Sequence, residues 1–164
     1  MKIISLLLIF SMVACQSVSN PNKKQPDSTK QLVGADKDKR GCIGSAGYTW
    51  SEAKGSCIRI FEDGTPFLKY DLATGIVDSS AVAYVVLSND KKKAEVFFGG
   101  TDKPVLMDAL PVIEEETMPV LFENTIEQIK LRSHRDTYQL LYMDTIRYLQ
   151  KYSAEKGLGK MLMK

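Results

Sequence analysis

A run of apolar and β-branched residues from Ala81 to Leu87 (AVAYVVL) constrains the fold of this 164-residue chain more than any other feature. Both faces of the run are apolar, which is typical of a strand in the middle of a sheet. Asn89-Asp90 then provides a turn, and Ala94 to Phe98 (AEVFF) has the composition of a second strand, closed by Gly99-Gly100. We therefore expect an antiparallel hairpin at the centre of a β-rich domain.

Further short strand patterns lie on both sides of this hairpin. We expect strands at Ile58 to Phe61, Phe67 to Asp71, Pro104 to Met107, Pro119 to Phe122 and Gln128 to Arg132. Proline at the start of two of these segments indicates edge strands or strand entries, because proline cannot donate to a sheet ladder. The pattern predicts a mainly β domain, a small antiparallel barrel or sandwich of about seven to nine short strands.

The segment from Thr137 to Gln150 fits two interpretations. Its apolar residues fall at helical spacing and would form an amphipathic stripe. Read with a period of two, Tyr138, Leu140 and Tyr142 face one way, and a turn at Met143-Asp144 leads into a second strand. We favour the closing hairpin, because short strands dominate upstream and tyrosine and β-branched residues are frequent here.

The N-terminus has the features of an export signal. Lys2 precedes an apolar run from Ile3 to Phe10, which is too short for the roughly 20 apolar residues that a spanning helix needs. Met12-Val13-Ala14-Cys15 then resembles the lipobox of bacterial lipoprotein precursors. The resemblance implies cleavage before Cys15, acylation of its thiol and amine, and an outer-membrane location, since Gln16 is not the aspartate associated with inner-membrane retention. An ordinary signal peptide with an incidental cysteine is the alternative.

The three cysteines of the chain become interpretable once Cys15 is assigned to lipid. Cys42 and Cys57 then form an even pair in an oxidising compartment, so we expect a disulfide between them. Thr49 and Glu52 have capping-box spacing and Gly55 is placed to end a helix, so we expect a short helical turn tied by this disulfide. Two cysteines and one histidine are too few to predict a metal site.

Charge and composition divide the chain into four regions. We expect a cleaved signal at 1–14, a lipidated N-terminus and flexible tether at 15–40, a globular domain at 41–150 and a frayed tail at 151–164. The predicted tether holds six basic and three acidic side chains, whereas residues 41–164 hold 15 basic and 17 acidic ones. The domain therefore lacks the concentrated basic face of a nucleic-acid binder.

The cysteine-bounded segment carries a second resemblance. Gly41-Cys42-Ile43-Gly44-Ser45-Ala46-Gly47-Tyr48-Thr49-Trp50, followed by Cys57-Ile58-Arg59-Ile60-Phe61-Glu62, resembles a segment of uncharacterised small envelope lipoproteins. The anchor followed by a disulfide-bonded β domain is also similar in plan to membrane-bound inhibitors of c-type lysozyme. That second likeness implies an alternative role as an inhibitor of lysozyme or of a protease, with no inhibitory residue carried over.

No catalytic set is recognisable. His134 is the only histidine, and a triad would have to combine it with Asp136 or Asp144 and an unidentified serine, with no G-x-S-x-G motif present. Glu114 to Glu116 could supply carboxylates for calcium or for glycoside chemistry, but a solvated acidic loop is the simpler interpretation. Lys91 to Lys93 fit a solubilising loop tip. We expect a protein that is not an enzyme and needs no cofactor.

Tyr48, Trp50, Arg59 and Phe61 are the candidate contact residues. They could pack over the disulfide as a small core, or they could form an exposed patch for a protein partner, because Trp, Tyr and Arg dominate interface hot spots. Together the features predict an outer-membrane-anchored lipoprotein, facing the periplasm or the cell surface, that acts by binding.

Overall fold

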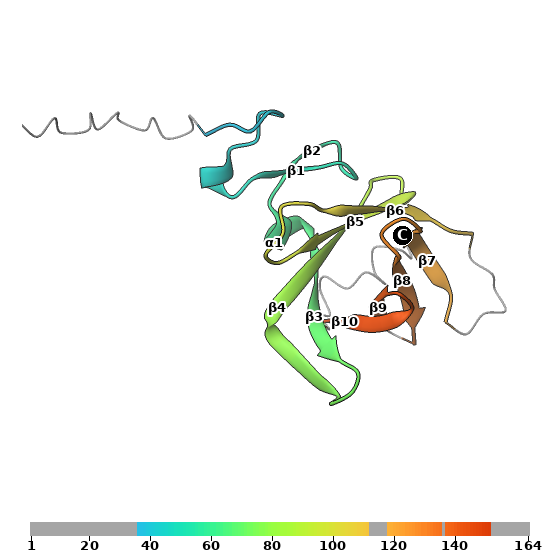
Figure 1. Ribbon diagram of the computed structural model, residues 1–164. Coiled ribbons are helices and arrows are strands. Elements are labelled where there is room, and N and C mark those ends of the chain that lie inside the picture. Colours follow the sequence, from blue (N-terminus) through green and yellow to red (C-terminus); the bar gives the residue numbers. More distant parts are fainter. Residues whose placement is uncertain (1–35, 112–117, 136, 152–164) are drawn as a thin grey trace, which may run out of the picture. The chain divides into compact units, whose positions relative to one another are not determined.

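The computed structural model describes residues 36–111, 118–135 and 137–151, all within one compact unit (Figure 1). A short 3-10 helix, η1 (Gly44–Ala46), and one helical turn, α1 (Ile60–Asp63), accompany ten strands. The strands are β1 (Thr49–Ser51), β2 (Ser56–Ile58), β3 (Thr65–Asp71), β4 (Ile76–Leu87), β5 (Lys93–Phe98), β6 (Val105–Ala109), β7 (Val120–Asn124), β8 (Ile129–His134), β9 (Thr137–Tyr142) and β10 (Thr145–Gln150).

Eight of the strands form a closed antiparallel barrel. Strands β3 to β10 pair in chain order, and β10 returns to pair with β3. The sequence predicted a barrel or a sandwich, and the structure is a barrel. Because each strand runs opposite to its neighbour, the loops after β3, β5, β7 and β9 share one end, which we call the open end. The connections after β4, β6 and β8 share the other, which we call the closed end.

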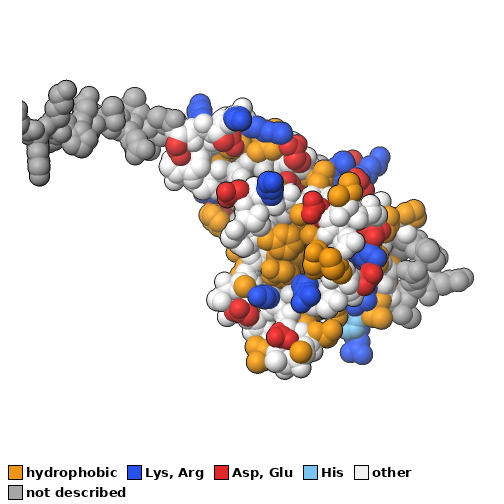
Figure 2. Space-filling model, viewed as in Figure 1, with side chains coloured by type: hydrophobic (Ala, Val, Ile, Leu, Met, Phe, Trp, Pro, Cys, Tyr) orange, Lys and Arg blue, Asp and Glu red, His pale blue; other side chains and the backbone are white. Residues whose placement is uncertain are grey.

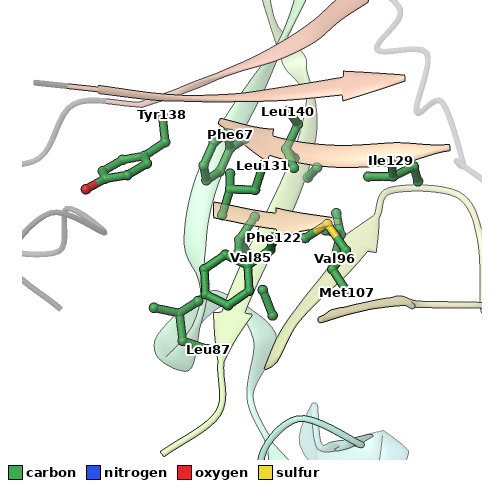
Figure 3. Close-up of a cluster of buried hydrophobic side chains, with 12 residues drawn as sticks. Phe67, Val85, Leu87, Val96, Met107, Phe122, Ile129, Leu131, Tyr138 and Leu140 are labelled. Carbon is green, nitrogen blue, oxygen red and sulfur yellow. The ribbon is translucent and has the colours of Figure 1, made fainter. Parts of the chain in front are cut away.

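The barrel interior is filled by alternate residues of its strands, as the two-residue period of a strand requires. Figure 3 shows these side chains meeting in the interior, among them Phe67, Phe122 and Leu131. All three are almost fully buried, as are Val85 and Met107. This packed layer closes the barrel in its middle and toward the closed end.

The central hairpin is confirmed, with one difference. Ala83 to Leu87 pair with Ala94 to Phe98 in the register expected of neighbouring buried strands. However, β4 begins at Ile76, five residues before the predicted run, and its first five residues are exposed. This part of β4 pairs with the end of β3, across a register shift, in a region where β4 has no register partner on β5.

The closing hairpin is also confirmed. Strands β9 and β10 pair through Tyr142 and Thr145, with Met143 and Asp144 as the two turn residues. The helical interpretation of Thr137 to Gln150 is therefore wrong. The structural reason is that this segment supplies the last two strands of the barrel, one paired with β8 and one with β3.

Two local predictions in the N-terminal segment differ from the structure. The helical turn expected between Thr49 and Gly55 is not confirmed, because Thr49 to Ser51 form strand β1 and the turn that follows carries a single bond from the Gly55 amide to the Ser51 carbonyl. Trp50 pairs with Cys57 across this hairpin. The strand expected at Ile58 to Phe61 is wrong, because β2 ends at Ile58 and α1 begins at Ile60.

The β1–β2 hairpin is held both by the disulfide and by the outside of the barrel. Cys42 and Cys57 are bonded as predicted. Ile58 packs against Val86 and Phe97 on the outer face of β4 and β5. Ordered contacts start before the predicted boundary at Gly41, since the Asp36 carboxylate accepts hydrogen bonds from Ser45.

Several predictions lie outside the described residues. These are the signal at 1–14, Cys15, most of the tether, Glu114 to Glu116, Asp136 and all but the first residue of the tail. Within the described ranges, no helix is long and apolar enough to cross a membrane.

Candidate functional site: the open end of the barrel

A cavity of about 1210 Å³ lies at the open end of the barrel. Ligand pockets in proteins are commonly about 300–1,000 Å³, are lined mostly by apolar side chains, and occur in the mouths of β-barrels. On the face shown in Figure 2, hydrophobic side chains gather near the middle, and Lys, Arg, Asp and Glu surround them. The cavity is therefore large enough for a small molecule and offers it mixed chemistry.

Seven of the eight barrel strands line the cavity, and we call one residue from each of them the ring. Register pairs Lys69 with Tyr148, Val105 with Val96, and Ile129 with both Asn124 and Tyr142. Most ring positions lie two residues from a buried interior residue of the same strand, whereas Ile129 itself belongs to the buried cluster. The ring, in chain order, is Lys69, Phe98, Val105, Asn124, Ile129, Tyr142 and Tyr148.

The apolar side of the ring is built on the packed core. Phe98, Val105 and Tyr148 all contact the buried cluster of the barrel interior, and Leu140 belongs to it. The rings of Phe98 and Tyr148 lie 5.6 Å apart between centroids, within the range of favourable aromatic pairs. A ligand entering the cavity would meet this aromatic pair and the aliphatic side chains beside it.

Polar groups in the ring are few. Burial raises the pKa of the Tyr148 hydroxyl, so the group stays protonated at neutral pH and can donate a hydrogen bond. Asn124 uses its side-chain amide to donate to the carbonyl of Leu106 at 2.7 Å, and its oxygen accepts from the backbone of Glu127 at 2.8 Å. Lys69 is the one cation of the ring, and no salt bridge within 4 Å engages it among the described residues.

Charges of both signs surround the ring, on strand ends and in the adjoining loops. They come from Glu52, Asp71, Asp102, Lys103, Glu127 and Arg147. Asp71 is committed to its own turn, since its carboxylate accepts from the backbone of Ala73 and Thr74. Because these charges are of both signs, the residues around the ring favour neither an anionic nor a cationic ligand. The apolar wall is therefore the main chemical character of the cavity.

Of the candidate contact residues, Tyr48, Arg59 and Phe61 do not line the cavity, whereas Trp50 lines a smaller neighbouring cavity together with Phe98 of the ring. The Arg59 guanidinium stacks 4.8 Å from the Tyr48 ring centroid, and Arg40 stacks at the same distance over Trp50. Phe61 lies beside Gly47 and is exposed. Tyr48, Arg59 and Phe61 are thus neighbours, whereas Trp50 pairs across the hairpin with the disulfide residue Cys57.

Of the residues considered for catalysis, His134 and Asp144 are described and are not brought together, and Asp136 lies outside the described residues. His134 ends β8 at the closed end, while Asp144 lies in the β9–β10 turn at the open end and pairs with Lys130 at 2.8 Å. Neither belongs to the ring of the cavity. Across the described ranges, no group of three or more His, Cys, Asp or Glu side chains is placed to hold a metal ion.

Sequence reasoning missed the ring. Its members come from seven strands, and each looks like an ordinary strand residue in its own segment. The only local signal was the period of two, which aligns ring and core positions on one face of each strand. No family model, curated protein or solved structure matches this chain.

Proposed function

We propose that this chain is a lipid-anchored protein of the bacterial envelope that binds a small apolar or amphipathic molecule at the open end of its barrel. The observation that carries the binding role is the cavity of about 1210 Å³ with its aromatic and aliphatic wall.

The envelope location is supported by the sequence alone. The short apolar run, the lipobox-like Met12 to Cys15 and the disulfide between the other two cysteines are consistent with export and acylation. Mass spectrometry of the protein purified from its native membrane tests this part. The expected product starts at an acylated Cys15, and an unmodified thiol at that position would remove the anchor from the proposal.

The binding site can be tested with two fluorescent probes on the full chain. Anilinonaphthalene sulfonate carries an apolar ring system and an anionic group, whereas Nile red is apolar and uncharged. We expect both probes to bind wild-type protein. Val105→Trp should abolish the binding of both, because the indole would fill part of the cavity that Val105 lines.

Two control variants complete the test. Val77→Trp places the same side chain on the exposed start of β4, outside the ring, and should leave binding of both probes unchanged. Lys69→Gln should weaken binding of the sulfonate probe and leave binding of Nile red unchanged, because only the sulfonate probe carries an anion that the Lys69 amine can attract. Equal probe binding by wild type and Val105→Trp, with both proteins folded, would refute binding in the cavity.

A further inference from the structure

The open end of the barrel carries the most exposed aliphatic side chains of the described chain. Leu72, Ile76, Ile126 and Met143 are 56%, 62%, 89% and 58% exposed, and no other large aliphatic side chain in the described ranges is more than half exposed. They come from three different hairpins, those of β3–β4, β7–β8 and β9–β10. Single exposed apolar residues are ordinary, but their confinement to one end is not explained by chance exposure alone.

Two turns of the closed end are polar. The β4–β5 turn carries Asn89, Asp90 and Lys92, with the Asp90 carboxylate accepting hydrogen bonds from Ser88 and from the backbone of Lys92. Arg135 is exposed at the β8–β9 turn. Elsewhere the closed end carries exposed apolar side chains too, Phe61 at 59%, Met118 at 43% and Leu110 at 37%, so the two ends differ in the polarity of these turns and not in every exposed residue.

We propose that the open end of the barrel docks on a lipid bilayer, with the side chains of Leu72, Ile76, Ile126 and Met143 inserted among the lipid headgroups. These residues sit at separate hairpin tips and do not line a groove. Separate apolar tips suit a fluid interface, which can close around each side chain, better than a rigid protein surface, which would need four matching pockets.

The length of chain between Cys15 and the described domain supports a bilayer as the partner of this surface. Only 20 residues, Gln16 to Ala35, separate the lipobox cysteine from the described domain, so they reach at most about 70 Å when fully extended. A barrel so tethered stays close to the bilayer and meets it repeatedly. This step rests on the proposed lipidation of Cys15, as does the blocking of that thiol in the test below.

The charges at the open end suit lipid headgroups without requiring anionic ones. Lys69, Lys103 and Arg147 form no salt bridge within 4 Å to any described residue. Asp102 and Glu127 lie on the same end and offset them. We therefore expect docking to depend on apolar insertion and to change little between low and high salt.

Spin labels on the full chain test the proposal. Single cysteines replace Ile76, Ile126 or Met143, with Lys92→Cys in the β4–β5 turn as the matched control at the closed end. The native cysteines do not interfere, because Cys42 and Cys57 are bonded to each other and Cys15 is blocked when acylated. The protein is mixed with vesicles of phosphatidylethanolamine and phosphatidylglycerol, and label accessibility is measured to oxygen and to a water-soluble nickel chelate.

We expect the three open-end labels to lose accessibility to the nickel chelate and gain it to oxygen on vesicles, while the label at position 92 does neither. Equal nickel accessibility at both ends would overturn the proposal. So would shielding of the open-end labels only after envelope proteins are added, because that would assign the surface to a protein partner. Loss of probe binding in the cavity would not alter either readout, so the two proposals fail separately.

Discussion

A single buried carboxylate joins the N-terminal hairpin to the barrel. Glu95 lies on β5 and is only 1% exposed, and its Oε2 atom accepts hydrogen bonds from the Ser51 hydroxyl at 2.5 Å and the Ala53 amide at 3.2 Å. No salt bridge among the described residues neutralises it. A buried charge depends on such donors, because an unpaired charge loses its hydration without compensation.

Removing the hydroxyl donor should therefore destabilise the protein. We expect Ser51→Ala to lower the free energy of unfolding by about 1.5–3 kcal/mol, the usual worth of a hydrogen bond to a charged group. Ser56→Ala is the control, because Ser56 lies directly opposite Ser51 in the hairpin but is exposed; it should change stability by less than about 0.5 kcal/mol. Guanidinium titration measures both, and equal effects would show that the Glu95 contact contributes nothing.

At the scale of the elements, the sequence correctly predicted strands whose own residues supply most of the buried face. Ala81 to Leu87 is identified by a continuous apolar, β-branched run, and Thr137 to Gln150 by apolar residues with a period of two. Patterns failed where contacts from elsewhere decide the outcome. Thr49 to Glu52 has a local helix signal, yet Thr49 to Ser51 form a strand that pairs with the segment of Cys57 and contacts Glu95 through Ser51.

The β9–β10 turn shows a different conflict between sequence and structure. Met143 and Asp144 both have positive φ angles, 48° and 57°, in a two-residue turn that favours Asn-Gly. We expect Met143→Asn to raise the free energy of unfolding by about 1 kcal/mol, because asparagine tolerates this conformation better. Thermal or denaturant unfolding measures the gain.

Ile126→Asn provides the comparison for that turn. Ile126 is also an exposed apolar residue at a hairpin tip, but it does not have a positive φ angle. Asparagine should bring no stabilisation there, and a gain equal to that at position 143 would contradict the conformational explanation. If the open end docks on a bilayer, Met143→Asn would stabilise the fold while weakening docking, which accounts for a strained methionine at this tip.

At the scale of the whole molecule, closure of the barrel could not be read from the sequence. The choice between barrel and sandwich depends on β10 pairing with β3, whose residues lie about 80 positions apart, as in the pair Tyr148 and Lys69. No local pattern encodes that contact. The cavity was missed for the same reason, because the ring exists only when seven strands are placed in register.

The barrel is not equally well bonded around its circumference. Strands β8 and β9 share six register pairs, whereas β6 and β7 share only two, Asp108 with Glu123 and Ala109 with Phe122. The β6–β7 seam is supplemented by the backbone bond from Leu110 to Leu121 and by the Asn124 side chain bonded to the Leu106 carbonyl. The Asn124 side chain thus supplies a hydrogen bond between β6 and β7, beside the cavity, where the two strands share few backbone pairs.

We expect the barrel to open first at this seam. In native-state hydrogen exchange, the Leu110 amide should exchange faster than the amides bonded between β8 and β9, through an opening that depends weakly on denaturant. Asn124→Leu removes the side-chain donor and should accelerate exchange at the seam while leaving β8 and β9 unchanged. Because Asn124 also belongs to the ring, the same opening would widen the cavity and give a ligand its way in. Exchange of Leu110 as slow as that of the β8–β9 amides would mean that the barrel opens only by global unfolding, and that ligands must enter through the open end alone.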